Sequence, residues 1–299
     1  MDRFQEMRVF AAVVELGSFV KAAAAMGLSK QATSRLVSEL EERLGVRLLL
    51  RTTRKLSLTD EGHVFHAHCR DLLAALEAAE SEVATRSGEV SGVLRVNVPL
   101  SFGLLQLAPL WPAFMARHPR LTLDVTLNDR VVDLVADGYD MAIRIARLPS
   151  SSMVSRKLAT TRVILCASPD YLARRGHPQR PEDLARHDVL AYSLLSTGDT
   201  WEFDGPQGPT TVKVTPRLRT NSGDTCRVAA LGGRGLIIQP SFLVAEDLRS
   251  GALVEVMPDW RCIELDVYAV YSSRKFLAPK VRHLIDYLVE SFATPGWPA

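Results

Sequence analysis

The sequence has few of the features that anchor, export or cross-link a protein. Its four cysteines are widely spaced and form no C-x-x-C pair, which argues against a disulfide framework or a zinc ribbon. No apolar run approaches the about 18 residues that a membrane helix needs. The run Val9–Val14 is short and has acidic neighbours, unlike a signal peptide. We therefore expect a soluble, cytoplasmic protein that has no membrane partner.

The motifs of common enzymes are also missing. There is no G-x-S-x-G, no P-loop and no G-x-G-x-x-G. Ser18-Phe19-Val20-Lys21 matches the S-x-x-K of acylating serine enzymes, but their companion motifs are absent. On a helix, His63 and His66 would share a face that His68 does not, which disfavours a metal site. We predict that the protein is not an enzyme and has neither a metal nor another cofactor.

The charge is nearly balanced but unevenly distributed. The net charge is +2. Residues 1–58 hold 10 basic and 6 acidic side chains, and the remainder holds 26 and 28. A length of 299 residues favours two domains. A basic segment joined to a slightly acidic body indicates that the N-terminal part binds a polyanion.

The first sixty residues have the pattern of three helices followed by a hairpin. Ser18 and Ser29 are placed to N-cap the second and third helices, and Gly27 supplies the turn between them. Two short strands, Val46–Leu50 and Leu56–Leu58, flank the basic loop Arg51–Lys55. The pattern favours a helix-turn-helix whose second helix enters the major groove, with the basic loop as a wing.

A long helix is predicted from Thr59-Asp60 onward. Its apolar residues follow one another in alternating steps of four and three, which is a heptad seam that requires a partner helix. The residues of this predicted dimerisation seam are Phe65, Cys69, Leu72, Leu76, Ala79 and Val83.

The remaining residues alternate between strands and helices. Strands are predicted at Leu94–Val98, Leu121–Leu127 and Met141–Ile145, with helices at Leu104–Phe114 and Val131–Ala136 between them. A second unit of this kind begins near Val163. This order predicts an α/β domain with a mostly parallel sheet. Cys166 and Cys226 are expected to be buried, inert thiols rather than a redox pair.

Together these motifs resemble LysR-type transcriptional regulators. The resemblance rests on Phe19–Ala23, Leu28–Arg35, Leu40–Leu48, Arg51–Arg54 and Leu58–Gly62, and it continues through Asp140–Arg144, Ala167–Leu172 and Leu236–Pro240. It implies a winged helix-turn-helix at 1–59, a linker helix and hinge at 60–91, and a two-lobed effector domain like a periplasmic binding protein at 92–299. The expected lobes are about 92–161 with 266–299, and 162–265.

The resemblance and the residue chemistry together predict the DNA-binding residues. Gln and Arg can contact adenine and guanine edges, and basic or hydroxyl side chains suit phosphates. The predicted residues are Ser29, Lys30, Gln31, Thr33, Ser34 and Arg35 in the helix, and Arg51, Thr52, Thr53, Arg54 and Lys55 in the wing.

An effector site is expected between the lobes, as the resemblance implies. Ser101 opens a predicted helix, where a free hydroxyl and free N–H groups favour an anion, so a small carboxylate is the favoured effector. Arg144 adds a full charge, and the alternative is that it simply pairs with Asp140 or another carboxylate of the chain. The predicted residues are Ser101, Phe102, Asn128, Arg144, Asn221, Ser222 and Gln239.

The sequence thus predicts a regulator whose binding to double-stranded operator DNA is modulated by a small molecule. A homodimer or homotetramer is expected, and RNA polymerase is a candidate partner. Two alternatives remain, namely a solute-binding module without direct DNA regulation and a ligand-independent regulator. The sequence leaves open the effector's identity, the operator, the target genes, and whether the protein activates or represses.

Overall fold

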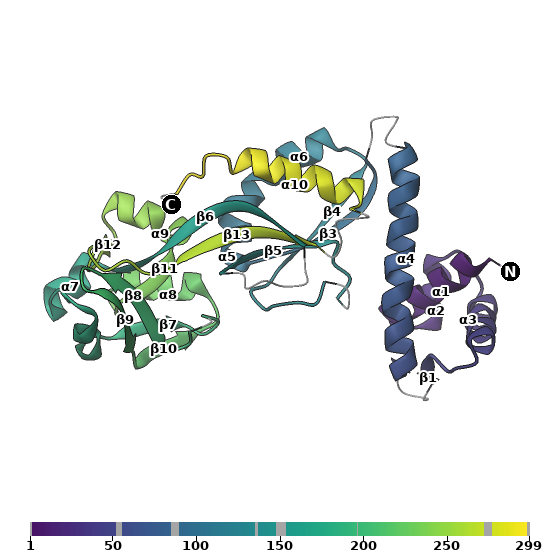
Figure 1. The fold of residues 1–299 in the computed structure, drawn as a ribbon, viewed down its shortest axis with the longest axis horizontal. Coiled ribbons are helices and arrows are strands. Elements are labelled where there is room, and N and C mark those ends of the chain that lie inside the picture. The colour runs from purple at the N-terminus through teal and green to yellow at the C-terminus, as the bar shows by residue number, and fades with distance from the viewer. Residues whose placement is uncertain are drawn as a thin grey trace. The chain divides into compact units, whose positions relative to one another are not determined.

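The computed structural model describes residues 2–51, 56–84, 90–134, 137–147, 154–195, 197–271 and 277–297. The chain forms two compact units, of which one contains residues 1–89 and the other most of residues 90–299. Within the described residues, no helix is both long and apolar enough to cross a membrane. Figure 1 shows the elements of both units.

The N-terminal unit, which we call the head, is helical with a small hairpin. Its elements are α1 (Arg3–Leu16), α2 (Phe19–Ala25), α3 (Lys30–Leu44), β1 (Leu49–Arg51), β2 (Leu56–Leu58) and α4 (Asp60–Ala84). The side chains of Ser18 and Ser29 accept hydrogen bonds at the starts of α2 and α3, as predicted. Gly17 and Gly45 end α1 and α3 in the left-handed region.

Two buried glutamates join the elements of the head. The Glu6 side chain is fully buried on α1 and accepts hydrogen bonds from Arg43 of α3. Glu41 is nearly buried, and its Oε1 accepts from the backbone amides of Leu48 at 2.8 Å and Leu49 at 3.1 Å. A buried carboxylate that accepts backbone N–H groups fixes the start of the hairpin against α3.

Replacing Glu41 with alanine is expected to destabilise the head. The amides of Leu48 and Leu49 would lose their buried acceptor, which costs about 1–3 kcal/mol for each unmet group. Chemical denaturation of Glu41→Ala should show the loss, whereas Glu42→Ala, at the exposed neighbouring position, serves as the control. Equal stabilities of the two variants would contradict this role.

The first turns of α4 belong to the core of the head. Cys69 is fully buried in the cluster that contains Val9, Phe10 and Val37. Phe65 packs against the same cluster, with its ring 5.7 Å from that of Phe10. The prediction that Cys69 contributes to the dimer seam is therefore wrong, because the chain itself buries this side chain. Phe65 is half-buried, and its place in the seam stays a prediction.

The second unit, which we call the regulatory unit, is built on one mixed sheet. Its strand order is β11-β6-β13-β5-β3-β4, with β12 also paired to β6. The strands are β3 (Gly92–Val98), β4 (Leu121–Leu127), β5 (Met141–Ala146), β6 (Val154–Ala167), β11 (Ile237–Pro240), β12 (Val254–Glu255) and β13 (Glu264–Tyr271). β3 runs parallel to β4 and β5, whereas β13 and β11 are antiparallel to their neighbours.

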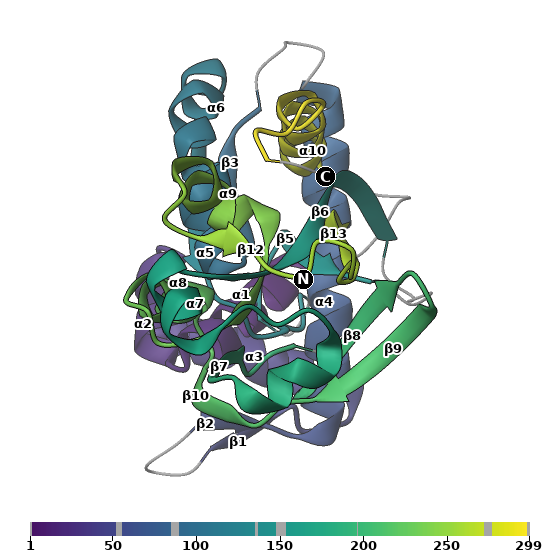
Figure 2. The same ribbon diagram turned by 90° about the vertical axis from the view of Figure 1, so that its left-hand side faces the viewer.

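Lobe 1 is the half of this unit that contains β3, β4 and β5. Its helices are α5 (Leu100–Phe102), α6 (Trp111–Arg117) and α10 (Pro279–Ser291), and a π-helical turn at Gly103–Leu107 and a 3₁₀ turn at Ala108–Leu110 join α5 to α6. In Figures 1 and 2, α6 and α10 lie on the same side of the strands. Residues 131–134 are not helical, so the predicted helix Val131–Ala136 is wrong over its described part.

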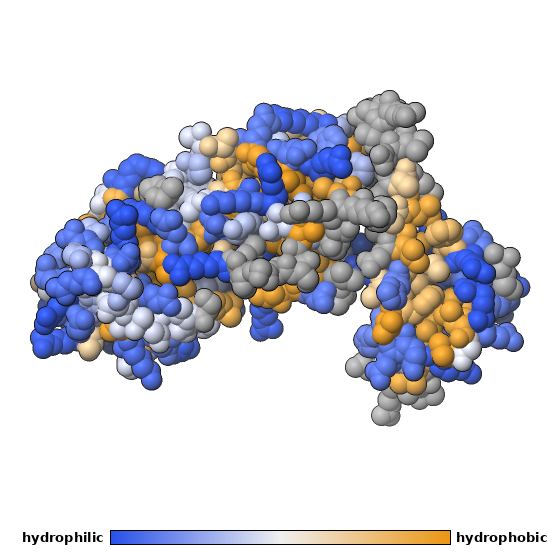
Figure 3. All heavy atoms as spheres, in the orientation of Figure 1, coloured by the Kyte–Doolittle hydropathy of each residue, from blue (hydrophilic) through white to orange (hydrophobic). Residues whose placement is uncertain are grey.

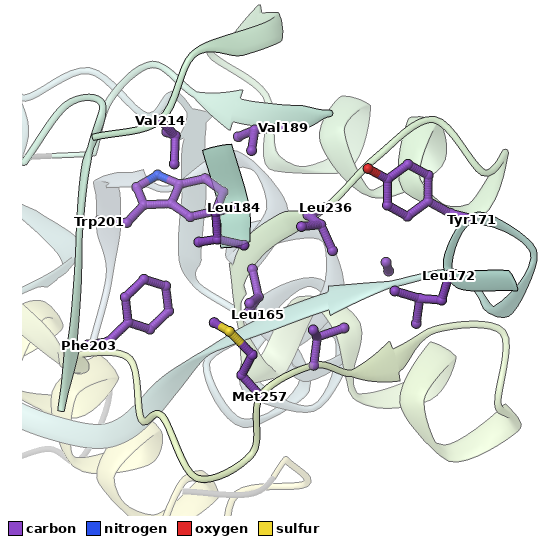
Figure 4. Close-up of a cluster of buried hydrophobic side chains, with 12 residues drawn as sticks. Leu165, Tyr171, Leu172, Leu184, Val189, Trp201, Phe203, Val214, Leu236 and Met257 are labelled. Carbon is purple, nitrogen blue, oxygen red and sulfur yellow. The ribbon is translucent and has the colours of Figure 1, made fainter. Parts of the chain in front are cut away.

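Lobe 2 has its own apolar core and, among the described residues, two smaller strand pairings. Its elements are α7 (Pro169–Arg175), a 3₁₀ helix (Pro181–Arg186), β7 (Val189–Tyr192), β8 (Thr200–Gly205), β9 (Gly208–Lys213), β10 (Pro216–Thr220), α8 (Gly223–Leu231) and α9 (Ser241–Ser250). β10 pairs with β7 and β8 with β9, outside the main sheet. Figure 4 shows Trp201 and Phe203 of β8 facing Leu165, Leu184 and Met257 in this core.

A small aromatic cluster holds the end of α6 against α10 in lobe 1. The His118 ring lies 4.7 Å from that of Phe114 and 5.1 Å from that of His283. Burial, His283 and Arg117 lower the pKa of His118 from its ordinary value of 6.5. The folded state therefore binds protons less readily than the unfolded state does.

The free energy of unfolding is accordingly expected to fall with acidification. The contribution of His118 is fully present above its unfolded pKa of about 6.5 and is lost as the pH falls through that value towards the lower folded pKa. Denaturant titrations between pH 7.5 and 5 should show a shallower decline for His118→Phe, which keeps an aromatic ring but does not titrate. His177→Phe, at an exposed position after α7, is the control, and a parallel decline in both variants would refute the assignment.

Candidate DNA-binding surface and effector site

The exposed face of α3 presents polar side chains next to its N-terminus. The Ser29 Oγ accepts from the amide of Ala32 at 3.1 Å. Lys30, Gln31 and Arg35 are exposed, and Ser34 is half-buried. The Arg35 side chain is 72% exposed and forms a loose 3.7 Å ion pair with Glu39, an exposed pairing that contributes little. The exposed side chains of Lys30, Gln31 and Arg35 are therefore accessible to the major groove of DNA.

Thr33 does not belong to this surface. It is fully buried, and its hydroxyl donates to the backbone carbonyl of Ser29 at 3.0 Å. The prediction that Thr33 contacts DNA is wrong, because position 33 lies on the same helix face as Val37 and Leu40, which are also buried.

The wing is described only at its base. β1 and β2 are antiparallel, with Leu49 opposite Leu58 and Arg51 opposite Leu56. Residues Thr52, Thr53, Arg54 and Lys55 lie outside the described residues, as does the side chain of Arg51. Their predicted contacts to DNA remain predictions.

Beyond the head core, α4 exposes apolar side chains. Leu72 is 50% exposed, Leu76 is half-buried and Ala79 is exposed, whereas the side chain of Val83 lies outside the described ones. Figure 3 shows hydrophobic atoms at the surface along α4. The part of the predicted seam that is available to a partner therefore begins at Leu72.

In the regulatory unit, the predicted anion site is occupied by carboxylates of the chain. The Ser101 hydroxyl donates to Asp224 Oδ2 at 2.5 Å, and the Leu100 amide donates to Asp129 Oδ1 at 2.9 Å. Ser101 lies in lobe 1 and Asp224 at the start of α8 in lobe 2. The expected free hydroxyl and free amide are therefore both engaged, and a lone carboxylate would meet two negative charges.

Phe102 is part of the core rather than of a site. It is fully buried, and its ring lies 5.1 Å from Phe242, 5.6 Å from Phe292 and 5.8 Å from Trp297. The prediction that Phe102 contacts the effector is wrong, because the packing of these rings fills the space around it.

The other predicted effector residues differ in their surroundings. The Asn128 side chain accepts from the Arg130 amide, and Ser222 caps α8 by accepting from the Thr225 amide. Asn221 is exposed, whereas Gln239 is 2% exposed. Arg144 Nη1 donates to Asn97 Oδ1 at 2.8 Å. Its suggested partner Asp140 is instead bound by Lys280 at 2.9 Å, which removes the alternative of an Asp140–Arg144 pair.

Sequence reasoning missed four residues of this region, namely Asn97, Asp129, Tyr192 and Asp224. Asp129 directly follows the predicted site residue Asn128, and Asp224 lies two residues after the predicted site residue Ser222. An acidic residue next to a predicted site residue was therefore the signal that could have identified both. Asn97 lies within the predicted strand Leu94–Val98 and Tyr192 lies outside every motif, so neither position carried a functional signal.

The cysteines and histidines show no reactive or metal-binding arrangement. Cys166 and Cys226 are fully buried, and burial raises the pKa of both thiols, that of Cys226 to about 11, which keeps them protonated. In the described part of the chain, no group of three His, Cys, Asp or Glu side chains is arranged to hold a metal ion.

The fold defines a DNA-binding transcriptional regulator with a separate regulatory domain. Residues 4–63 match the model of the bacterial regulatory helix-turn-helix proteins of the lysR family, and residues 87–293 match the LysR substrate binding domain. The chain belongs to the LysR family of transcriptional regulators, whose members are not enzymes.

Relatives match over nearly the whole chain. An HTH-type transcriptional regulator of Haemophilus influenzae is 37% identical over 281 residues, covering 94% of this chain and 98% of its own length. The structure of CrgA from Neisseria meningitidis has a TM-score of 0.64 at 35% identity and covers 97% of this chain and 99% of its own. Full-length AphB of Vibrio cholerae has a TM-score of 0.62 at 28% identity, with the same coverage.

Proposed function

We propose that this regulator binds an operator in double-stranded DNA as a homo-oligomer and that a small-molecule effector in the regulatory unit modulates this binding in the cytoplasm. The observation that carries the proposal is the two-sided α3. Its inner face buries Thr33, Val37 and Leu40, and its outer face presents Lys30, Gln31 and Arg35 next to a capped N-terminus.

The head supplies the DNA contacts of this proposal. Lys30, Gln31, Ser34 and Arg35 contact bases or the adjoining backbone, and Ser29 caps the helix that carries them. The wing residues Arg51–Lys55 bind phosphates. The chain associates through α4 from Leu72 onward, and two heads then bind two half-sites as one unit. RNA polymerase is a further candidate partner.

A gel shift with the promoter region adjoining its own gene tests the proposal. The affinity should exceed that for a scrambled duplex of equal length. For six to ten phosphate contacts, the affinity should fall by about 10³–10⁵ between 50 and 200 mM salt. A solute-binding module without DNA regulation would show neither the preference nor the salt dependence.

A further inference from the structure

Four buried side-chain donors of the regulatory unit have no hydrogen-bond partner among the described residues. One is Trp201 Nε1 in the lobe 2 core, and the other three are Asn97 Nδ2, Arg144 Nη2 and Gln239 Nε2. Asn97 is fully buried and Gln239 is 2% exposed. Buried polar groups in proteins are nearly always paired with protein, water or ligand, so these donors indicate acceptors that the chain does not itself supply.

Neighbouring residues connect these donors to the contact between lobe 1 and lobe 2, which is the hydrogen bond between Ser101 and Asp224. Arg144 holds Asn97 at 2.8 Å, and Asn97 lies three residues before Leu100 at the end of β3. In lobe 2, Gln239 Oε1 lies 3.0 Å from the position that a β-carbon on Gly223 would take. The next residue, Asp224, accepts the hydroxyl hydrogen bond of Ser101.

Two carboxylates at this contact receive hydrogen bonds from neutral groups. Asp129 accepts from the Leu100 amide and is bonded to the Tyr192 hydroxyl, whose pKa it raises together with burial. Asp224 accepts from Ser101. Arg227, one turn along α8 from Asp224, is paired with Asp247. A cationic group of a ligand would therefore be stabilised next to the two carboxylates.

The Arg144 guanidinium carries the opposite, equally uncompensated charge. Burial lowers its pKa, and in the described part of the chain no carboxylate lies within salt-bridge distance of it. Its Nη1 donates hydrogen bonds to the Asn97 side chain and to the Ile143 carbonyl. A half-buried guanidinium whose Nη2 is inaccessible and unpaired is a strong candidate to bind a ligand carboxylate.

We propose that the effector is zwitterionic, with a carboxylate and a protonated amine on one small body, as in an amino acid. This inference rests on the proposed function, because it specifies the ligand of that same site. The ligand carboxylate accepts from Arg144 and Asn97, and its ammonium lies against Asp224 and Asp129. Gln239 donates to a further acceptor of the ligand.

Ligands with a single charge fit this arrangement less well. A plain carboxylate would satisfy Arg144 but add a third negative charge next to Asp129 and Asp224. A plain amine would neutralise the carboxylates but leave Arg144 without a carboxylate partner. Both charges on one molecule are needed to compensate both sides.

The test uses the full-length protein and matched probes. The twenty protein amino acids are each compared with the carboxylate and the amine that lack one of their charged groups. We expect at least one amino acid to raise the melting temperature by binding the folded state. Calorimetry should give an affinity at least tenfold higher than for either of its two analogues.

Charge-removing variants identify the groups responsible. Asp224→Asn should weaken binding of that amino acid at least tenfold and leave its deaminated carboxylate unaffected or bound more tightly. Arg144→Gln should weaken both. Glu246→Gln, an exposed acid on α9, is the matched control and should change neither affinity.

Three results would overturn the inference, namely no binding by any amino acid, equal binding of its deaminated carboxylate, or an unchanged affinity in Asp224→Asn. Gel shifts on the same samples separate this failure from that of the proposed function. If a carboxylate alone alters operator binding, the effector-responsive function stands and the zwitterion fails. If the protein does not bind operator DNA at all, the proposed function itself fails.

Discussion

Replacing Leu72 and Leu76 together with lysine is expected to dissociate the oligomer and to weaken operator binding by about 10²–10⁴-fold. Leu72 is 50% exposed and Leu76 is half-buried, so neither is essential to the core of the head. Lysines at both positions would place like charges across an interface that buries them. Two heads that no longer bind as one unit lose the gain from effective concentration.

Sedimentation should show the monomer, and gel shifts should show the loss of affinity. Leu72→Met with Leu76→Met is the matched control, because methionine keeps an apolar side chain of similar size and should preserve the oligomer. An unchanged sedimentation coefficient in the lysine variant would place the interface elsewhere.

Arg35→Ala is expected to weaken operator binding by about 1–3 kcal/mol and to relax the sequence preference. An arginine that makes a bidentate contact to a guanine edge contributes discrimination of that size. The loose contact with Glu39 at 3.7 Å does not prevent Arg35 from reaching a base. Binding titrations on operator and scrambled duplexes measure both effects.

Arg54→Ala provides the comparison for this variant. A wing residue that binds phosphate should weaken all duplexes alike and reduce the salt dependence by about one counterion. Arg35→Ala and Arg54→Ala should therefore differ in how they change sequence preference. If both variants bind the two duplexes as the parent does, the proposed DNA-binding surface is wrong.

The burial of Thr33 shows that a sequence motif locates a DNA-binding helix without assigning each of its residues to the DNA or to the core. The run Lys30–Arg35 identifies a DNA-reading helix, but each residue contacts either the groove or the core, depending on its angle around the helix. Thr33 lies on the same face of α3 as Val37 and Leu40, and the packing of α3 in the head decides that this face is buried.

The heptad seam of α4 likewise cannot be assigned from spacing alone. Apolar residues at alternating steps of four and three form one face of a helix, and either the same chain or a second chain can cover that face. Cys69 is buried within the same chain and Phe65 packs partly against Phe10 of α1, whereas Leu72 is exposed. Hydrophobic spacing does not distinguish an internal partner from a second copy.

The sequence by itself determined the family, the order of head and regulatory part, the capped helices and the sites of their turns. These features depend on local chemistry, such as the hydroxyls of Ser18 and Ser29 and the left-handed glycines Gly17 and Gly45. Only the tertiary structure decided the charge around Ser101. Asp129 is close in sequence to the predicted site, but Asp224 is 123 residues from Ser101. Contacts across such separations arise from the packing of the lobes. The sequence therefore indicated the Ser101 hydroxyl as a donor, and only the folded chain showed that Asp224 is its acceptor.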